Sequence, residues 1–296
     1  MERRKRRKRK SRKTIYGILA VAVVFFCILT YSFLHPKSQI NINRGSSYKA
    51  AIVDHLSLSA PNQTFIQTAT NILEKAGYTV DYYPGEEVNV ELHRNLPTRG
   101  YDLIVLRVHS ALKNASDPPL CLFTSQPYSN EYLLEQLTDR IGRVSFIVDK
   151  PPFYFGIPPN FIRSSMNGRF ENTIIIMMGC NGLTYTKMAE ALIEKGAKAY
   201  ISWDEKVSAS HTDKATIHLL QKLTIEKQTI KQAVTETMEE VGPDPIDGST
   251  LQYYPDSVDN YFVPNIAGNS MSYHATISGY DSSFILSMFI VPDVEK

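Results

Sequence analysis

The stretch TIIIMMGC, residues 173–180, decides the fold of this 296-residue chain. It is among the most apolar segments after residue 34, and it ends in Gly179 and Cys180. The stretch YDLIVLRVHS, residues 101–110, has a similar form, because its aliphatic run is interrupted only by Arg107 and is followed by His109. Continuous apolar runs of this length are typical of strands that are buried on both faces of a parallel sheet. We therefore expect two central strands, each of which ends next to a polar or reactive side chain.

Further strands and helices alternate around these two stretches. Strand-like runs lie at 50–56, 78–83, 144–149 and 198–203, and helical patterns lie at 62–77, 130–141, 187–195, 215–223 and 230–238. Capping residues such as Asn62 and stop residues such as Gly77 and Gly196 bound these helices. The alternation predicts an α/β domain over residues 48–242 with a largely parallel sheet covered by helices on both faces. Residues 243–296 form a C-terminal extension with turns and strands that add an antiparallel edge.

The N-terminus has the pattern of a membrane anchor. Residues 14–34 contain no charged side chain over 21 positions, which is long enough for a helix to cross a bilayer. Ten Lys and Arg residues lie just before it, within positions 1–13, so the positive-inside rule keeps that tail in the cytoplasm. We expect an uncleaved single-pass helix, a linker at 35–47, and an extracytoplasmic C-terminal domain. Without the basic tail the chain is mildly acidic, so no nucleic-acid partner is expected.

The candidate chemistry lies where the two central strands end. Ligands of open α/β sheets bind beyond the carboxyl ends of the strands, and His109 and Cys180 both follow a buried strand. If the two strands are neighbours, an imidazole and a thiol face each other across one crevice. An imidazolium beside a thiol favours the thiolate, which is the nucleophile of cysteine peptidases.

The motif around Cys180 resembles a known group of proteins. A buried strand ending in His, and a second ending in the Cys180-Asn181-Gly182 motif, are similar to the caspase, gingipain and CHAT-domain cysteine peptidases. The sequence at 188–216, MAEALIEKGAKAYISWDEKVSASHTDKAT, is similar to the CHAT type, and the resemblance covers about residues 48–241. It implies a caspase-like three-layer sandwich, a peptide or protein substrate, and no cofactor.

The resemblance also implies roles for individual residues. Cys180 would be the nucleophile and His109 the general base and then acid, while the backbone N–H groups of Cys180 and Ser110 would form an oxyanion hole. This chain departs from many relatives at two positions: Ser110 follows the histidine in place of Gly, and Gly179 precedes the cysteine in place of Ala or Ser.

Acidic residues follow the strand at 198–203. Several relatives cleave after Arg or Lys, and Asp204, Glu205 and Asp213 would complement a basic substrate side chain. The alternative is that Asp204 caps the next helix and that Asp213 is solvated.

Other interpretations of the central pair remain open at this point. A cysteine after a buried strand is often packed in a core, a histidine there is often structural, and Cys121 could form a disulfide with Cys180. The chain would then be an inactive caspase-like domain that binds a peptide or a partner protein. His211 and His218 share one helix face but lack a third ligand, so no metal site is predicted.

Overall fold

The computed structural model describes residues 48–112, 119–147 and 150–264 of the chain. The predicted basic tail at 1–13, the predicted membrane helix at 14–34 and the linker at 35–47 lie outside these residues, as does most of the C-terminal extension. Within the described ranges, no helix is both long enough and apolar enough to span a bilayer.

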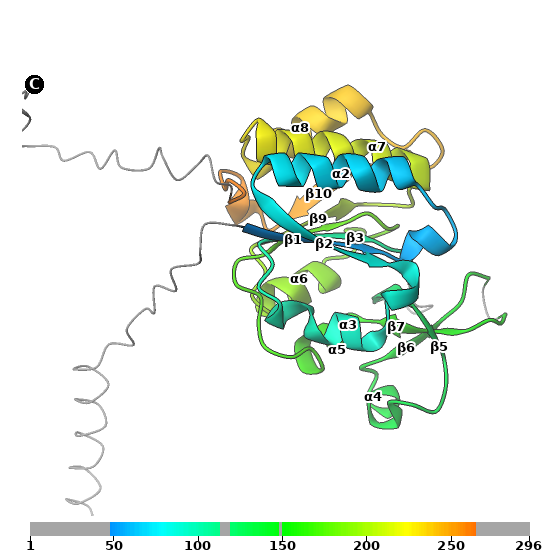
Figure 1. Cartoon of the computed structure of the whole chain (residues 1–296). Helices are drawn as coiled ribbons and strands as arrows, with labels where there is room; N and C mark the ends of the chain where they lie inside the picture. Colours follow the sequence, from blue (N-terminus) through cyan, green and yellow to red (C-terminus); the bar gives the residue numbers. More distant parts are fainter. Residues whose placement is uncertain (1–47, 113–118, 148–149, 265–296) are drawn as a thin grey trace, which may run out of the picture. The chain divides into compact units, whose positions relative to one another are not determined.

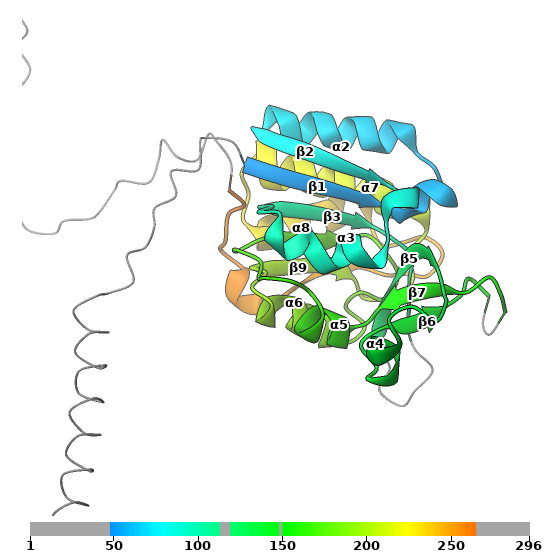
Figure 2. The same cartoon turned by 60° about the horizontal axis from the view of Figure 1, so that its bottom comes forward.

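A six-stranded sheet forms the centre of the described domain. Its order is β10-β9-β8-β3-β1-β2, and every pairing is parallel except that of β10 with β9. Figure 2 shows β2, β1, β3 and β9 following one another across the domain. The strands are β1 (Tyr48–Asp54), β2 (Tyr78–Pro84), β3 (Leu103–Arg107), β8 (Ile174–Met177), β9 (Ala199–Trp203) and β10 (Leu251–Tyr254). The predicted mixed α/β fold with a mostly parallel sheet is confirmed, and so is the antiparallel edge strand after residue 242.

Helices cover both faces of this sheet (Figure 1). One face carries α2 (Gln63–Lys75), α7 (Ala209–Leu220) and α8 (Ile230–Val241), and the other carries α3 (Val90–Asn95), α5 (Pro159–Ser164) and α6 (Lys187–Glu194). A π-helical turn at 221–225 continues α7, and short 3-10 turns lie at 55–58, 85–87, 96–98 and 256–258.

The alternation of side chains along the strands builds two separate cores. Leu103 and Val105 of β3 pack with α2, α7 and α8, whereas Ile104 and Leu106 pack with α3, α5 and α6. The strands β1 and β8 divide their residues in the same way. Two-sided burial explains why these strands are continuous apolar runs in the sequence.

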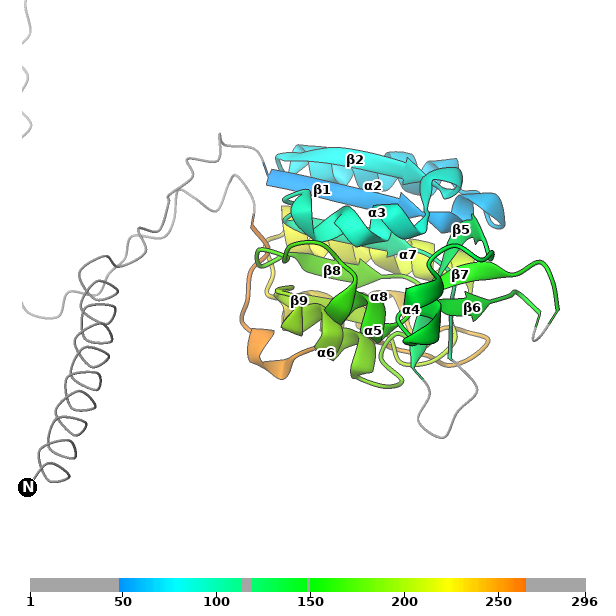
Figure 3. The same ribbon diagram turned by 90° about the horizontal axis from the view of Figure 1, so that it is seen from below.

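A second, smaller sheet was not predicted. It is antiparallel with the order β4-β5-β7-β6, and it lies beyond the carboxyl ends of the central strands (Figure 3). Its strands are β4 (Ser110–Leu112), β5 (Leu120–Pro127), β6 (Gly142–Val144) and β7 (Tyr154–Ile157). Of the strand expected at 144–149, only Val144 belongs to a strand (β6), residues 145–147 do not continue it, and residues 148–149 lie outside the described ranges. The helix expected at 130–141 is limited to α4 (Leu133–Leu137).

Candidate functional site

The two central strands are neighbours, as the candidate site requires. β3 and β8 pair in parallel with Leu106 opposite Met177, and the Met178 N–H continues the ladder by donating to the Leu106 carbonyl at 2.9 Å. The Val108 carbonyl lies 2.4 Å from the position that a Cβ on Gly179 would occupy. The segments that carry His109 and Cys180 therefore leave the sheet side by side.

A direct contact joins these two segments. The Ser110 hydroxyl donates to the Cys180 carbonyl at 2.6 Å. A Cβ at position 179 would lie 2.5 Å from that hydroxyl oxygen, so the serine side chain fills the space that Ala or Ser would need there. The two departures from the caspase-like pattern, at 110 and 179, are thus coupled by packing.

The backbone of Ser110 has a defined orientation. The Phe123 N–H donates to the His109 carbonyl at 2.9 Å, and Ser110 lies opposite Leu122 in the β4–β5 ladder. Opposed residues in antiparallel sheets alternate between hydrogen-bonded and non-hydrogen-bonded pairs. Since His109 and Phe123 form a hydrogen-bonded pair, the next pair, Ser110 and Leu122, is not hydrogen-bonded, and the Ser110 N–H points away from β5. The oxyanion role of the Ser110 and Cys180 N–H groups stays a prediction.

His109 and Cys180 are both half-buried, and each has a polar partner. The Cys180 thiol donates to the Val207 carbonyl at 3.6 Å, just before α7. The His109 Nε2 atom pairs with the Ser59 hydroxyl at 2.8 Å, just before α2. Both side chains therefore contact loops that lead into helices of the same sheet face, and their catalytic roles stay a prediction.

Aromatic rings surround His109. Ring centroids of Phe146, His55 and Phe123 lie 5.1, 5.7 and 6.0 Å from its own, and the His55 ring meets it edge-on. Phe146 belongs to the turn between β6 and β7 and is half exposed, so it shields one side of the imidazole from water.

Burial and a nearby positive charge keep these imidazoles neutral. Burial, and then the charge of Arg107, lower the pKa of His109 below its ordinary value of 6.5. Burial, with smaller contributions from His109 and His93, lowers the pKa of His55 to about 4. At neutral pH His109 can therefore accept a proton, but it does not supply a resident positive charge for a thiolate.

Arg107 binds the chain segments behind the candidate site, a role that the sequence did not predict. Its guanidinium is fully buried and donates to both oxygens of Asp213 at 2.7 and 2.8 Å, to Asp54 at 2.7 Å and to the Ala60 carbonyl at 2.8 Å. Burial alone would lower its pKa, but the hydrogen bonds that it donates to the two carboxylates raise it. The signal in the sequence was a charged residue inside an otherwise apolar strand, which requires buried partners.

Two of the three predicted substrate-binding carboxylates, Asp213 and Asp204, are engaged within the protein. Asp213 is 5% exposed and is held by Arg107 and by the Asn62 amide, so the alternative that it is solvated is wrong. Asp204 accepts from the Thr250 N–H and hydroxyl at 2.7 and 2.6 Å, whereas the N-cap of α7 is Ser208. The alternative that Asp204 caps that helix is therefore also wrong, and Glu205 is the exposed member of the acidic set.

Cys121 and Cys180 do not form a disulfide in the structure. Cys121 is buried in β5, where it packs against Phe123 and Val144 of the small sheet. The disulfide alternative is therefore not realised, and Cys180 keeps its thiol.

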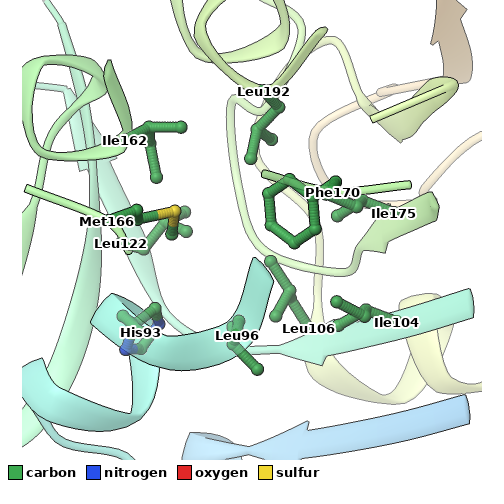
Figure 4. Close-up of a pocket in the computed structure, with 10 residues that line it drawn as sticks. All are labelled: His93, Leu96, Ile104, Leu106, Leu122, Ile162, Met166, Phe170, Ile175 and Leu192. Atoms are coloured by element: carbon green, nitrogen blue, oxygen red, sulfur yellow. The ribbon is translucent and has the colours of Figure 1, made fainter. Parts of the chain in front are cut away.

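Two cavities are lined by residues other than His109 and Cys180. One cavity has a volume of about 10 Å³, enough for roughly one water molecule. It lies on the sheet face that carries α3, α5 and α6, and it is lined by His93 and nine apolar side chains (Figure 4). A wider groove of about 440 Å³ lies between α8 and β10. Across the described ranges, no three His, Cys, Asp or Glu side chains are grouped closely enough to hold a metal ion.

Comparisons with known proteins show distant structural similarity to solved structures. No protein-family model matches the sequence, and no curated protein matches it. Among solved structures, the Arg-specific cysteine proteinase gingipain R (RGPB) is similar to this chain with a TM-score of 0.42 and 13% sequence identity. The match covers 74% of this chain and 48% of that proteinase, so the chain spans about half of that protein's length.

Proposed function

We propose that this chain is a membrane-anchored cysteine endopeptidase of caspase-like three-layer architecture, in which Cys180 and His109 form the catalytic dyad. The Cys180 thiol would give its proton to His109 and attack the scissile carbonyl of a peptide. The leaving amine would take that proton as the acyl thioester forms, and water activated by His109 would then release the acid and restore the thiol. Backbone N–H groups of Cys180 and Ser110 would stabilise the tetrahedral oxygen.

One observation carries this proposal. β3 and β8 are adjacent and parallel, so the chain segments that bear the imidazole and the thiol leave the sheet together, and the Ser110 hydroxyl joins them at 2.6 Å from the Cys180 carbonyl. This position beyond the carboxyl ends of neighbouring strands is where open α/β sheets bind ligands.

A second candidate function is an inactive caspase-like module that binds a peptide or a partner protein. It is favoured by the present contacts of the two side chains, because the Cys180 thiol donates to Val207 and the His109 Nε2 atom is paired with Ser59. In this alternative His109 is a structural residue of the aromatic cluster, and Cys180 is an ordinary thiol.

Alkylation of Cys180 separates the two functions without knowledge of the substrate. Full-length protein in detergent micelles is treated with iodoacetamide from pH 5.5 to pH 9, and modified Cys180 is quantified by peptide mass spectrometry. For a dyad we expect the wild type to react below the ordinary thiol range near pH 8.5, and we expect His109→Ala to lose this low-pH reactivity. His218→Ala is the matched control, because His218 lies on α7, its side chain is 38% exposed, and it bonds to Glu240. Equal pH profiles for wild type and His109→Ala would favour the binding module.

The membrane location is proposed from the sequence. The uncharged stretch at 14–34 and the basic residues before it support a cytoplasmic N-terminus and an extracytoplasmic domain. In intact cells, a protease added outside should digest the domain after residue 47 and spare a tag placed at residue 1. Protection of the domain together with the tag would contradict this orientation.

A further inference from the structure

The loop between β1 and α2 is fixed at both of its ends by one buried side chain. Arg107 of β3 donates to the Asp54 carboxylate, where the loop begins, and to the Ala60 carbonyl, where it ends. Asp54 also accepts from the Ser57 N–H at 3.0 Å, which shapes the intervening 3-10 turn. Two residues after Arg107 along the chain, His109 meets this loop at Ser59.

The aromatic packing around His109 fixes the plane of its ring, but it does not fix which of the two orientations related by a half-turn the ring adopts. A half-turn about the bond that joins the imidazole to Cβ exchanges nitrogen and carbon positions that have nearly the same shape, so the surrounding rings of Phe123 and Phe146 do not distinguish them. A polar partner does, because only a nitrogen can form its hydrogen bond. That partner here is the Ser59 hydroxyl, 2.8 Å from Nε2.

The order of the strands places Ser59 and Cys180 on opposite sides of His109. β3 lies between β1 and β8, and Ser59 belongs to the loop that follows β1, whereas Cys180 follows β8. A ring whose Nε2 atom is turned towards the β1 side has its other nitrogen, Nδ1, available on the side of β8.

We infer that Ser59 is a positioning residue, which holds the proton of His109 on Nε2 and leaves the lone pair of Nδ1 for the Cys180 thiol. This inference rests on the proposed function. The Nε2–H group donates to the Ser59 oxygen throughout the reaction. Nδ1 accepts the thiol proton as the carbon–sulfur bond forms, and Nδ1–H gives that proton to the leaving amine. The ring returns to its starting tautomer, so no net proton is gained or lost.

The tautomer is measured directly by ¹⁵N NMR of histidine-labelled full-length protein in micelles, with the His109 signals assigned from the His109→Ala spectrum. We expect the wild type and Ser59→Thr, which keeps the hydroxyl, to carry the proton on Nε2. Ser59→Ala should show a mixture of both tautomers, which a merely structural role of Ser59 would not produce. A proton on Nδ1 in the wild type, or an unchanged tautomer in Ser59→Ala, overturns the inference.

The iodoacetamide assay then links the tautomer to reactivity. Loss of one hydrogen bond of ordinary strength should slow the low-pH alkylation of Cys180 in Ser59→Ala roughly two- to tenfold, and Ser59→Thr should react like the wild type. If His109→Ala abolishes this reactivity but Ser59→Ala does not change it, the inference fails and the proposed function stands. If His109→Ala changes nothing, the dyad and the role of Ser59 both fail.

Discussion

Arg107 is the side chain that holds together the three chain segments behind the candidate site. It joins β3 to Asp54 at the end of β1 and to Asp213 in α7, with exposed fractions of 0, 1 and 5% for the three residues. Removing one member of a buried ion cluster leaves the others charged and unpaired in a medium that solvates them poorly. The stability of this part of the protein should therefore depend on Arg107 more than on any exposed ion pair.

Replacing Arg107 with Met tests this dependence. The thioether has a similar length but no donor for the two carboxylates, so we expect the free energy of unfolding to fall by about 3–5 kcal/mol. Denaturant unfolding followed by circular dichroism measures the loss. Arg163→Met is the control, since the Arg163–Glu194 pair is exposed and its loss should cost less than about 1 kcal/mol. A similar small loss for both variants would contradict the structural role of Arg107.

The sequence signalled Arg107 but could not name its partners. A charged residue within LIVLRV must be paired if the strand is buried, yet Asp54 and Asp213 lie 53 and 106 residues away along the chain. The same limit applied to Ser59, whose contact with His109 spans 50 residues. The strand ends that carry His109 and Cys180 were predictable because they follow from local hydrophobic patterns, whereas the side-chain partners follow from tertiary packing.

At the scale of elements, Asn62, the N-cap residue of α2, links the helix to the buried cluster. The Asn62 oxygen accepts from the Phe65 N–H at 3.0 Å, and its amide donates to Asp213 at 2.9 Å. The residue that the sequence marked as a helix cap therefore also satisfies a lone pair of a buried carboxylate. Its loss should affect the start of α2 and the Arg107 cluster together.

The variants Asn62→Ala and Asn62→Ser separate these two effects. Asn62→Ala removes the cap and the donor, and we expect a loss of about 1–2 kcal/mol in the free energy of unfolding. Asn62→Ser keeps an oxygen for the Phe65 N–H, so its loss in the same denaturant experiment should be smaller. Equal losses for both variants would show that the cap contributes nothing measurable.

The elements that were predicted correctly are those whose own residues show the hydrophobic pattern of the whole strand or helix. β3, β8 and β9 are buried along their whole length, and α6 ends at Glu194, just before the stop residue Gly196 that its sequence indicates. The small sheet escaped prediction because its strands β4 and β6 have three residues each and β5 ends in Pro127. Its strands are recognisable only after they pair, so the part of the molecule that encloses His109 was the part least visible in the sequence.

For the whole molecule, buried histidines make stability depend on pH. His55 and His93 are 2 and 1% exposed, and burial lowers the pKa of both. An unfolded chain protonates histidine near pH 6.5, while folded His55 does so at about 4. Between these values the unfolded state binds more protons, so stability is fully present above pH 6.5 and decreases as the pH falls towards 4.

Urea unfolding at pH 7.5, 6.5, 5.5 and 4.5 tests this dependence in wild type and in His55→Gln. In the wild type, protonation of His55 should lower the free energy of unfolding by on the order of 3 kcal/mol at the lowest pH. This contribution should be absent from His55→Gln, because glutamine cannot take up a proton. The variant should therefore lose less stability on acidification than the wild type, even if it is less stable at pH 7.5. Parallel pH profiles would mean that His55 titrates alike in the folded and unfolded states. In that case burial would not keep the His55 imidazole neutral in the folded protein.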